Sequence, residues 1–254
     1  ENEKQNIKVA AYDLHNYYAK ADYSKALEYL VSVQNIYHYK EVFVANTAGN
    51  VVLSTDADHI ETNMFSSETG TTIFSRQYFK KARSGETFVS DVAGSVIPIT
   101  NEEGQLELGM PTMFISTPIL STDAQVLGVL VFRIDIKQIN SLMFHMNATK
   151  SGDVYLINKN GYMLTESRFT DALELVGHIE KRTALELHVV NPDTNNLTLA
   201  AKKCITGDEA KHSGYGYADY RNRRVLGYWV WMDEYNWGVI VEIDLAEACQ
   251  DIRE

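Results

Sequence analysis

The sequence predicts an α+β fold of two tandem modules, each a central antiparallel sheet flanked by helices, with a long helical segment at the N-terminus. Three observations indicate this fold. The first 40 residues have helical periodicity, a strand–turn–strand pattern occurs twice, and so does a strand that leads directly into a helix. The length of 254 residues also exceeds that of a typical single domain, which favours two modules.

Residues 1–40 are expected to form a helical stalk, because apolar side chains recur there at three- and four-residue spacing. A break is expected near Asp22, and neither stretch around it contains Gly or Pro. The recurring positions are Ile7, Ala10, Leu14, Tyr17 and Ala21, then Tyr23, Leu27, Leu30, Val33 and Tyr37.

A hairpin is predicted directly after the stalk. Residues 41–45 and 51–53 are β-rich, and Asn-Thr-Ala-Gly-Asn between them supplies turn residues. The same order returns at an offset of 112 residues, which matches Asn46 with Asn158 and Gly49 with Gly161. The glycine suits a tight turn, because it adopts positive φ without a Cβ clash.

A second match closes each half of the chain. Residues 128–131 are Gly-Val-Leu-Val, followed by Ile-Asp-Ile at 134–136, and residues 238–241 are Gly-Val-Ile-Val, followed by Ile-Asp-Leu at 243–245. The offset is 109 to 110 residues, and a helical pattern follows each strand, at 137–144 and at 246–253. Two independent matches at nearly one offset indicate a duplicated module.

The two modules are therefore expected at residues 41–144 and 145–254. The predicted strands are 41–45, 50–54, 87–91, 111–120 and 125–135 in the first, and 153–157, 162–166, 215–220, 224–232 and 237–243 in the second. The segments 55–86 and 165–213 differ most between the halves. They are turn-rich, and binding residues are expected in such segments.

Charge and cysteine content exclude some classes of protein. The net charge of −11 argues against nucleic-acid binding, which needs a basic face, and against adhesion to anionic lipid. Cys204 and Cys249 show no metal-ligand spacing and are expected to be buried or half-buried thiols, with a disulfide as the alternative. There is no run of 18 apolar residues, and both chain ends lie in helical patterns, as expected of a domain cut from between two membrane spans.

No catalytic residues, metal ligands or cofactor are predicted. The seven histidines are scattered without an HExxH or Cys–His cluster, and the glycine patterns of hydrolases, P-loop proteins and dinucleotide-binding proteins are missing from the sequence. The chain is therefore predicted not to be an enzyme. The remaining alternative is a catalytic constellation assembled only in three dimensions.

The N-terminal helix, the duplicated strand–turn–strand and the ending Gly-Tyr-Trp-Val-Trp…Asn-Trp-Gly-Val-Ile-Val-Glu-Ile-Asp resemble the double Cache family of PAS-like sensor domains. These domains occur outside the membrane in histidine kinases, chemoreceptors and cyclic-dinucleotide enzymes. The resemblance covers almost the whole chain. It is most specific in the second half, at residues 152–157, at the Asp-Tyr-Arg turn of residues 219–221 and at Trp237-Gly238.

The resemblance implies an extracytoplasmic domain, periplasmic or extracellular, of a membrane-anchored receptor that is most often a sensor histidine kinase. The long first helix would run along both modules and mediate a homodimer. A membrane-distal first module would hold a small-molecule ligand, and a membrane-proximal second module is often empty. The alternatives are a ligand-free dimerisation or interaction module of a surface protein, and the sensor of a chemoreceptor or cyclic-dinucleotide enzyme.

The resemblance also implies ligand residues in the first module. In members that bind amino acids, an Arg and an aromatic residue two positions later hold the ligand carboxylate, and a second aromatic and a strand Asp complete the site around the amine. Arg76, Tyr78, Phe79 and Asp135 occupy these positions here. Tyr78 replaces the family's Trp, Phe79 its Tyr, and Thr71 an upstream Tyr. These changes remove or move donors, so a carboxylate, an amine or another metabolite is as well supported as an amino acid.

Three further candidates come from strand alternation, which places Thr112, Phe114 and Ser116 on one face of their strand. Hydroxyls around an aromatic ring suit a pocket, although this face could instead belong to the core. Arg76 has an alternative role in a surface ion pair with Glu68. Asp135 could instead cap or anchor the following helix, as its counterpart Asp244 could. The aromatic side chains of the second module are expected mainly in its core: Tyr155, Tyr217, Tyr220, Tyr228, Trp229 and Trp231.

Overall fold

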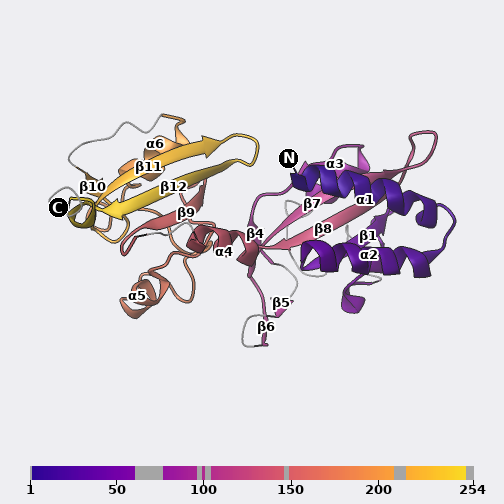
Figure 1. Cartoon of the computed structure of the whole chain (residues 1–254), viewed down its shortest axis with the longest axis horizontal. Coiled ribbons are helices and arrows are strands. Elements are labelled where there is room, and N and C mark those ends of the chain that lie inside the picture. The colour runs from indigo at the N-terminus through magenta and orange to yellow at the C-terminus, as the bar shows by residue number, and fades with distance from the viewer. Residues whose placement is uncertain are drawn as a thin grey trace. The chain divides into compact units, whose positions relative to one another are not determined.

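The computed structural model describes residues 2–60, 77–95, 99–100, 104–145, 149–208 and 216–249. The chain divides into two compact units, a first unit of Glu1–Asp135 and a second unit of Ile136–Glu254. Each unit contains one main antiparallel sheet with helices packed on it (Figure 1). The predicted α+β fold with two sheets and an N-terminal helical segment is therefore confirmed.

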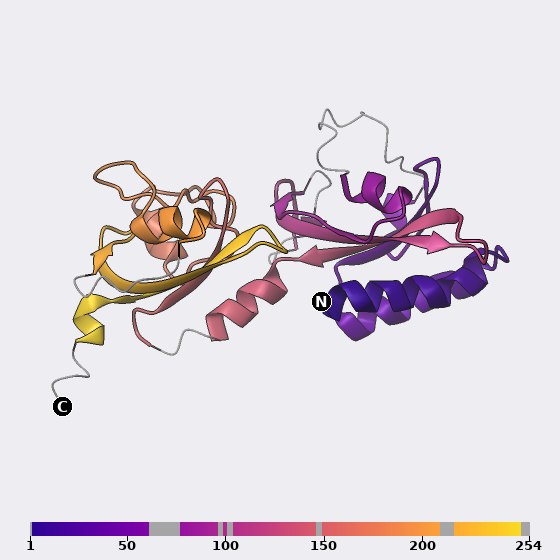
Figure 2. The same cartoon turned by 90° about the horizontal axis from the view of Figure 1, so that it is seen from above.

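The N-terminal segment consists of two helices, α1 (Asn2–Tyr18) and α2 (Tyr23–Tyr37), which lie side by side on one face of the first sheet (Figures 1 and 2). The predicted break near Asp22 is confirmed. Asp22 precedes α2 and accepts a hydrogen bond from the Lys25 N–H at 3.4 Å. The α2 helix ends at His38, which adopts a left-handed conformation with φ of 57°. Of the predicted apolar positions, Ile7, Ala10, Leu14, Leu30 and Val33 are buried.

The first sheet has the strand order β2-β1-β8-β7-β3, and β4 also pairs with β7. A short helix, α3 (Gln77–Arg83), lies on the face opposite α1 and α2 (Figure 2). A separate two-stranded sheet pairs β5 (Ile99–Thr100) with β6 (Leu106–Glu107), and a 3-10 helix spans Ala57–His59. The strands of the main sheet are β1 (Glu41–Asn46), β2 (Val51–Ser54), β3 (Phe88–Val89), β4 (Ala93–Gly94), β7 (Pro111–Leu120) and β8 (Val126–Asp135).

Alternation along the central strands separates two faces of the first sheet. The face under α1 and α2 carries the even-numbered side chains of β1 and β8, whose buried members are all apolar: Val42, Val44, Leu130, Phe132 and Ile134. The opposite face packs on α3 through one cluster of buried residues: Phe43, Ala45, Val51, Tyr78, Phe79, Ala82, Val129 and Val131. The face opposite α1 and α2 is called the α3 face from here on.

The second sheet has the order β10-β11-β12-β9. Its core packs on α6 and includes Tyr155, Ile157, Cys204, Trp229 and Ile240. The elements of this unit are α4 (Lys137–His145), β9 (Asp153–Asn158), α5 (Thr170–Leu175), α6 (Leu199–Ile205), β10 (Tyr217–Ala218), β11 (Arg224–Met232), β12 (Trp237–Asp244) and α7 (Leu245–Ala248).

The duplication predicted from the sequence is visible in the pairing of strands. The order β1-β8-β7-β3 of the first sheet repeats as β9-β12-β11-β10 in the second. The turns after β1 and β9 match in detail. Gly49 and Gly161 have φ of 87° and 81°, and the side chains of Asn46 and Asn158 each accept a backbone hydrogen bond from the residue four positions later at 3.0 Å.

The predicted strand at 162–166 is wrong. Only isolated bridges form there, Ile157 with Met163 and Tyr162 with His188. The backbone of Met163 bonds to Leu187 O at 2.9 Å and to Leu185 N at 2.7 Å, so its hydrogen bonds are directed away from β9. Met163, Leu164 and Thr165 are nevertheless buried, and a loop segment takes the place of the neighbouring strand.

The ends of other predicted elements also differ. The strands expected at 87–91 and 215–220 are limited to Phe88–Val89 and Tyr217–Ala218 within the described ranges. The helix expected at 246–253 is described as Leu245–Ala248, and residues 250–254 lie outside the described part of the chain.

Both cysteines are free thiols. Cys204 on α6 is buried, as expected, and burial raises the pKa of its thiol to about 11. The expectation for Cys249 is wrong, since this thiol is exposed. It follows α7, a short helix in which no residue is buried. No helix within the described ranges combines the length and the apolarity needed to cross a bilayer.

Candidate functional site

Six of the seven predicted ligand residues lie on the α3 face of the first unit. Tyr78 and Phe79 belong to α3, and the remaining four lie on two paired strands: Thr112, Phe114 and Ser116 on β7, and Asp135 at the end of β8. Thr112 is directly opposite Asp135 in the register. The seventh residue, Arg76, lies outside the described residues. The structure thus brings together residues that are up to 57 positions apart in the sequence.

Several of these six side chains attach α3 to the sheet. The Tyr78 ring stacks on Phe114 with a centroid distance of 4.4 Å and an interplanar angle of 16°. Ser116 Oγ donates a hydrogen bond to Tyr78 O at 2.8 Å, and Thr112 Oγ1 donates to Ile134 O at 3.1 Å. Phe79 is fully buried in the core cluster. Phe114 and Asp135 are half-buried, so these two offer the most accessible surface of the six.

A buried ion pair that sequence reasoning missed lies next to these residues. In the register, Phe114 of β7 is opposite Arg133 of β8, and Arg133 is opposite Glu41 of β1. Arg133 is 4% exposed and Glu41 is 1% exposed, and the distance between Arg133 Nη1 and Glu41 Oε2 is 3.5 Å. Burial of two opposite charges on one side of the sheet costs free energy of desolvation unless the charges are paired, as they are here.

Glu41 has further partners. Its Oε1 atom contacts His59 Nδ1 at 2.5 Å and accepts a hydrogen bond from Ser54 Oγ at 2.7 Å. Burial works to raise the pKa of Glu41. The hydrogen bond and charge of His59, the Ser54 hydroxyl and the charge of Arg133 outweigh burial and hold this pKa below its ordinary value. Glu41 is therefore an ionised group at neutral pH.

The Arg133 guanidinium has further N–H donors besides the one that faces Glu41. Its Nη2 donates to Ser95 Oγ at 2.7 Å, and its guanidinium carbon lies 5.9 Å from the centroid of the Phe114 ring. Among the described residues its buried Nε has no hydrogen-bond partner. An unpaired N–H of a buried guanidinium is rare, and an oxygen of a bound anion would satisfy it.

The sequence did contain a signal for this pair. Arg133 is a charged residue inside the segment 129–134 of β8, whose other members are apolar, and it lies two positions before Asp135 on the same face. Glu41 opens an equally apolar strand. Charged side chains inside buried strands require partners. For this reason the sequence alone could have identified both positions as members of a buried ion pair.

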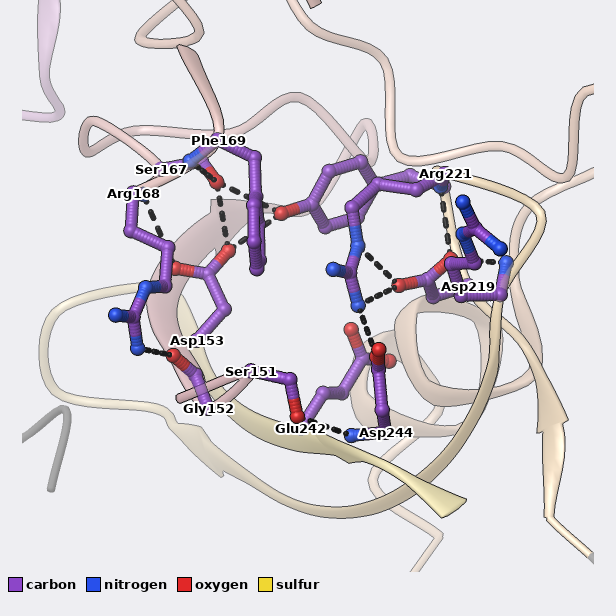
Figure 3. Close-up of polar contacts among 12 residues, drawn as sticks. Ser151, Gly152, Asp153, Ser167, Arg168, Phe169, Asp219, Arg221, Glu242 and Asp244 are labelled. Atoms are coloured by element: carbon purple, nitrogen blue, oxygen red, sulfur yellow. Dashed lines mark hydrogen bonds and ion pairs between the residues drawn. The ribbon is translucent and has the colours of Figure 1, made fainter. Parts of the chain in front are cut away.

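The second unit carries a polar network at the corresponding place (Figure 3). Gly227 of β11, Glu242 of β12 and Asp153 of β9 are opposite one another in the register, as Phe114, Arg133 and Glu41 are in the first unit. Glu242 accepts hydrogen bonds from Tyr217 Oη at 2.7 Å and from Tyr155 Oη at 2.9 Å.

Asp153 is bonded to groups from two loops. It accepts from Ser167 Oγ at 2.8 Å, from the Arg168 N–H at 3.3 Å and from the Tyr220 hydroxyl (Figure 3). Asp153 and Glu242 are each 1% exposed. Two carboxylates therefore occupy adjacent buried positions where the first unit has a carboxylate and a guanidinium.

Arg221 connects this network to the start of α7. Its guanidinium contacts Asp219 at 2.6 Å and Asp244 at 2.8 Å, and lies 3.9 Å from the centroid of the Phe169 ring (Figure 3). Asp244 precedes α7 but makes no side-chain capping bond. Of the two roles considered for Asp244, capping or anchoring the following helix, capping is wrong, because its carboxylate binds Arg221 instead.

The aromatic side chains of the second unit are mainly core residues, as expected. Tyr155, Tyr220 and Trp229 are buried in the core cluster, and Tyr217 and Trp231 pack against it. Tyr228 is the exception, at 57% exposed. Among the described residues, no three His, Cys, Asp or Glu side chains are grouped in a way that could hold a metal ion.

Comparison with known proteins agrees with this architecture. The Cache domain family model matches residues 4–252. The periplasmic sensory domain of the Campylobacter jejuni chemoreceptor Tlp1 is similar at 13% identity and a TM-score of 0.57, over 97% of this chain and 88% of that one. The extracellular domain of the putative histidine kinase vpHK1S-Z8 is similar at 17% identity and a TM-score of 0.59, over 100% and 88% of the two chains.

A third similar structure is the ligand-binding domain of Mlp24 with asparagine, at 12% identity and a TM-score of 0.50, over 100% of this chain and 88% of that one. A comparison with curated proteins gives no match. The identities are too low to show more than the fold, whereas the family model spans nearly the full chain. The predicted family resemblance is thus confirmed, and the chain belongs to the Cache domain family, whose members are extracellular ligand-binding sensor modules.

Proposed function

We propose that this chain is the extracytoplasmic sensor of a transmembrane signalling receptor and that it binds a small metabolite on the α3 face of the first unit. The observation that carries the proposal is the difference between the two faces of the first sheet. The buried side chains on the face under α1 and α2 are apolar apart from Thr117, whereas the α3 face contains Arg133, Glu41 and Asp135 beside the ring of Phe114. Charged groups beside an aromatic ring are typical of a ligand site.

The proposed ligand carries a carboxylate, an amine or both. Arg133 offers an unpaired N–H to an anion, and Asp135 offers a negative charge to an ammonium group. The family resemblance adds Arg76 as a carboxylate partner, while Tyr78, Phe79 and Thr71 remove or move donors that are typical of amino-acid-binding members. The similar domain of Mlp24 is described with asparagine. Small organic acids, amines and amino acids are therefore the compounds to test.

The proposed output is a conformational signal passed through the membrane to a cytoplasmic domain, most simply a histidine kinase. A ligand shifts the balance between two receptor states only through its different affinity for them. The similar structures include extracellular domains of putative histidine kinases and the sensory domain of a chemoreceptor, which supports both kinds of output.

A homodimer through the N-terminal helices is part of the proposal. The surface of α1 and α2 exposes apolar side chains that do not contribute to the core, among them Tyr12 at 77%, Ile36 at 67% and Val9 at 50%. The same observation favours the second candidate function, a ligand-free interaction module. A dimer that forms by analytical ultracentrifugation and is lost in Tyr12→Glu would support the helical interface under either function.

A thermal-shift screen against amino acids, organic acids and amines tests the ligand proposal. A saturating ligand at 100 times its Kd should stabilise the protein by about 2.7 kcal/mol. The duplication supplies a matched control, since Asp135 and Asp244 occupy equivalent positions at the ends of β8 and β12. Asp135→Asn should abolish the shift produced by an amine or amino-acid ligand, and Asp244→Asn should leave it unchanged.

The opposite pattern, in which only Asp244→Asn abolishes the shift, would place the ligand in the second unit and contradict the proposal. Arg76→Ala tests the residue implied by resemblance alone. If this variant kept the full shift with every carboxylate ligand, Arg76 would not be part of the site. A screen without any stabilising compound would favour the interaction module.

A further inference from the structure

We propose that the second unit contains a buried proton-binding site, formed by Glu242 and Asp153 opposite each other on β12 and β9, and that release of its proton alters how Arg221 holds the start of α7. The site is separate from the proposed ligand face and goes beyond the proposed function. It would make the second unit respond to pH.

The argument begins with an excess of buried negative charge. Directly opposite residues on paired antiparallel strands have Cβ atoms about 5 Å apart, and Glu242 and Asp153 are such a pair. Hydroxyl groups and one backbone N–H donate hydrogen bonds to them. Within the described part of the second unit, no Lys, Arg or His side chain is bonded to either carboxylate. Two adjacent buried carboxylates without a cation favour the retention of one proton.

The first unit shows that this fold does not require two acids at these positions. Its equivalent pair is Glu41 and Arg133, in which the charges compensate each other. After the duplication, the same place on the central strand thus carries a cation in one unit and an acid in the other. The second unit keeps its site polar through tyrosine hydroxyls, which can donate to the carboxylate but cannot neutralise it.

The groups around Glu242 shift its pKa in opposite directions. Burial raises its pKa most strongly, the Tyr217 and Tyr155 hydroxyls lower it, and the charges of Asp219 and Asp153 raise it, with a result of about 7. Gly227 on β11 completes the site, because a Cβ there would overlap the Tyr217 hydroxyl and would lie 3.2 Å from Glu242 Cγ. The groups that face Glu242 are thus hydroxyl donors and acids from β9, β10 and the β10–β11 turn.

The site adjoins the helix that leaves the second sheet. Asp244, two residues after Glu242, donates its N–H to Ser151 Oγ at 3.0 Å and binds Arg221 through its carboxylate. Glu247 of α7 accepts from the Ser151 N–H at 2.7 Å. The Arg221 guanidinium binds both Asp219 and Asp244 (Figure 3). When Glu242 loses its proton, the new charge competes for Arg221 and weakens its bond to Asp244.

Carboxyl-carbon NMR of the whole chain labelled at glutamate tests the proton site directly. One glutamate should titrate with a midpoint of about 7. This titration should disappear in Glu242→Gln and persist in Glu174→Gln, which removes an exposed carboxylate of α5 in the same unit. Tyr217→Phe removes a hydrogen bond that lowers the pKa of Glu242, so its midpoint should rise. This variant also tests the site if Glu242→Gln does not fold.

A wild-type protein in which no glutamate titrates above about pH 6 would overturn the site, because an ordinary glutamate titrates near 4.3. So would a neutral titration that persists in Glu242→Gln. The link to α7 has its own readout, the backbone amide shifts of Ser151 and Leu245. They should move with the same midpoint as Glu242, and shifts that stay constant across this range would overturn the link.

Discussion

At the scale of single residues, the two units differ most in how they compensate buried charge. Arg133 and Glu41 neutralise each other in the first unit, whereas Glu242 and Asp153 depend on hydroxyl donors in the second. A buried ion pair contributes little compared with a well-packed apolar pair, but removal of one partner leaves a charge without compensation. The consequences of substitution at these positions therefore depend on which partner remains.

Arg133→Met should reduce the free energy of unfolding by about 3 kcal/mol, because it removes the guanidinium that pairs with the buried Glu41 carboxylate. The double variant Glu41→Gln with Arg133→Met should lose less than the sum of the two single losses, since no unpaired charge remains. Urea denaturation of the four proteins measures this coupling. Strictly additive losses would mean that the 3.5 Å contact contributes nothing specific.

At the scale of elements, the same strand order is built from different amounts of regular structure. The turn after β1 leads into β2, whereas the equivalent turn after β9 leads into a segment that forms only isolated bridges. The core face of the second sheet depends instead on α6, whose residues Ala200, Ala201 and Cys204 are buried against it. The start of α6 is thus important for the packing of the whole unit.

Thr198 caps α6 by accepting a hydrogen bond from the Ala201 N–H at 3.3 Å, and its side chain is 1% exposed. Thr198→Ala should lower the free energy of unfolding of the second unit by about 1 kcal/mol, because it removes the oxygen that satisfies this N–H. Thr198→Ser retains the hydroxyl and serves as the control. Guanidinium denaturation followed by tryptophan fluorescence is suitable, since all three tryptophans lie in this unit. Equal losses in both variants would point to packing of the methyl group instead.

At the scale of the whole molecule, the two units should respond to pH in opposite directions. The lowered pKa of Glu41 contributes stability above its ordinary value of 4.5, and this stability is lost as the pH falls. The raised pKa of Glu242 contributes stability that is fully present below 4.5 and is lost as the pH rises to about 7. The chain should therefore be most stable at weakly acidic pH.

Thermal unfolding as a function of pH should show a maximum near about pH 5, with losses on both sides. The decline toward neutral pH should be on the order of 3 kcal/mol and should be much smaller in Glu242→Gln. The decline on the acidic side should persist in that variant, since Glu41 is unchanged. A wild-type melting temperature that is highest above about pH 7 would contradict the assigned direction for Glu242.

The proposed ligand residues and the module boundaries remain predictions, although the structure places six of the seven residues on one face. Phe79 and Ser116 illustrate why the sequence alone could not distinguish residues that contact a ligand from residues that support the fold. Alternation put Ser116 on the face of Phe114, yet its hydroxyl holds the backbone of Tyr78 on α3. Whether a polar side chain on such a face serves a ligand or the fold depends on what packs above it.

The sequence by itself determined the duplicated fold, the two N-terminal helices, the central strands and the matched turns at Gly49 and Gly161. These features depend on apolar periodicity and backbone preference, which are properties of neighbouring residues. Only the tertiary structure decided that Arg133 pairs with Glu41, 92 positions away, and that Glu242 faces Asp153, 89 positions away. The charge state of a buried group is set by its partners in space, and long-range strand pairing chooses those partners.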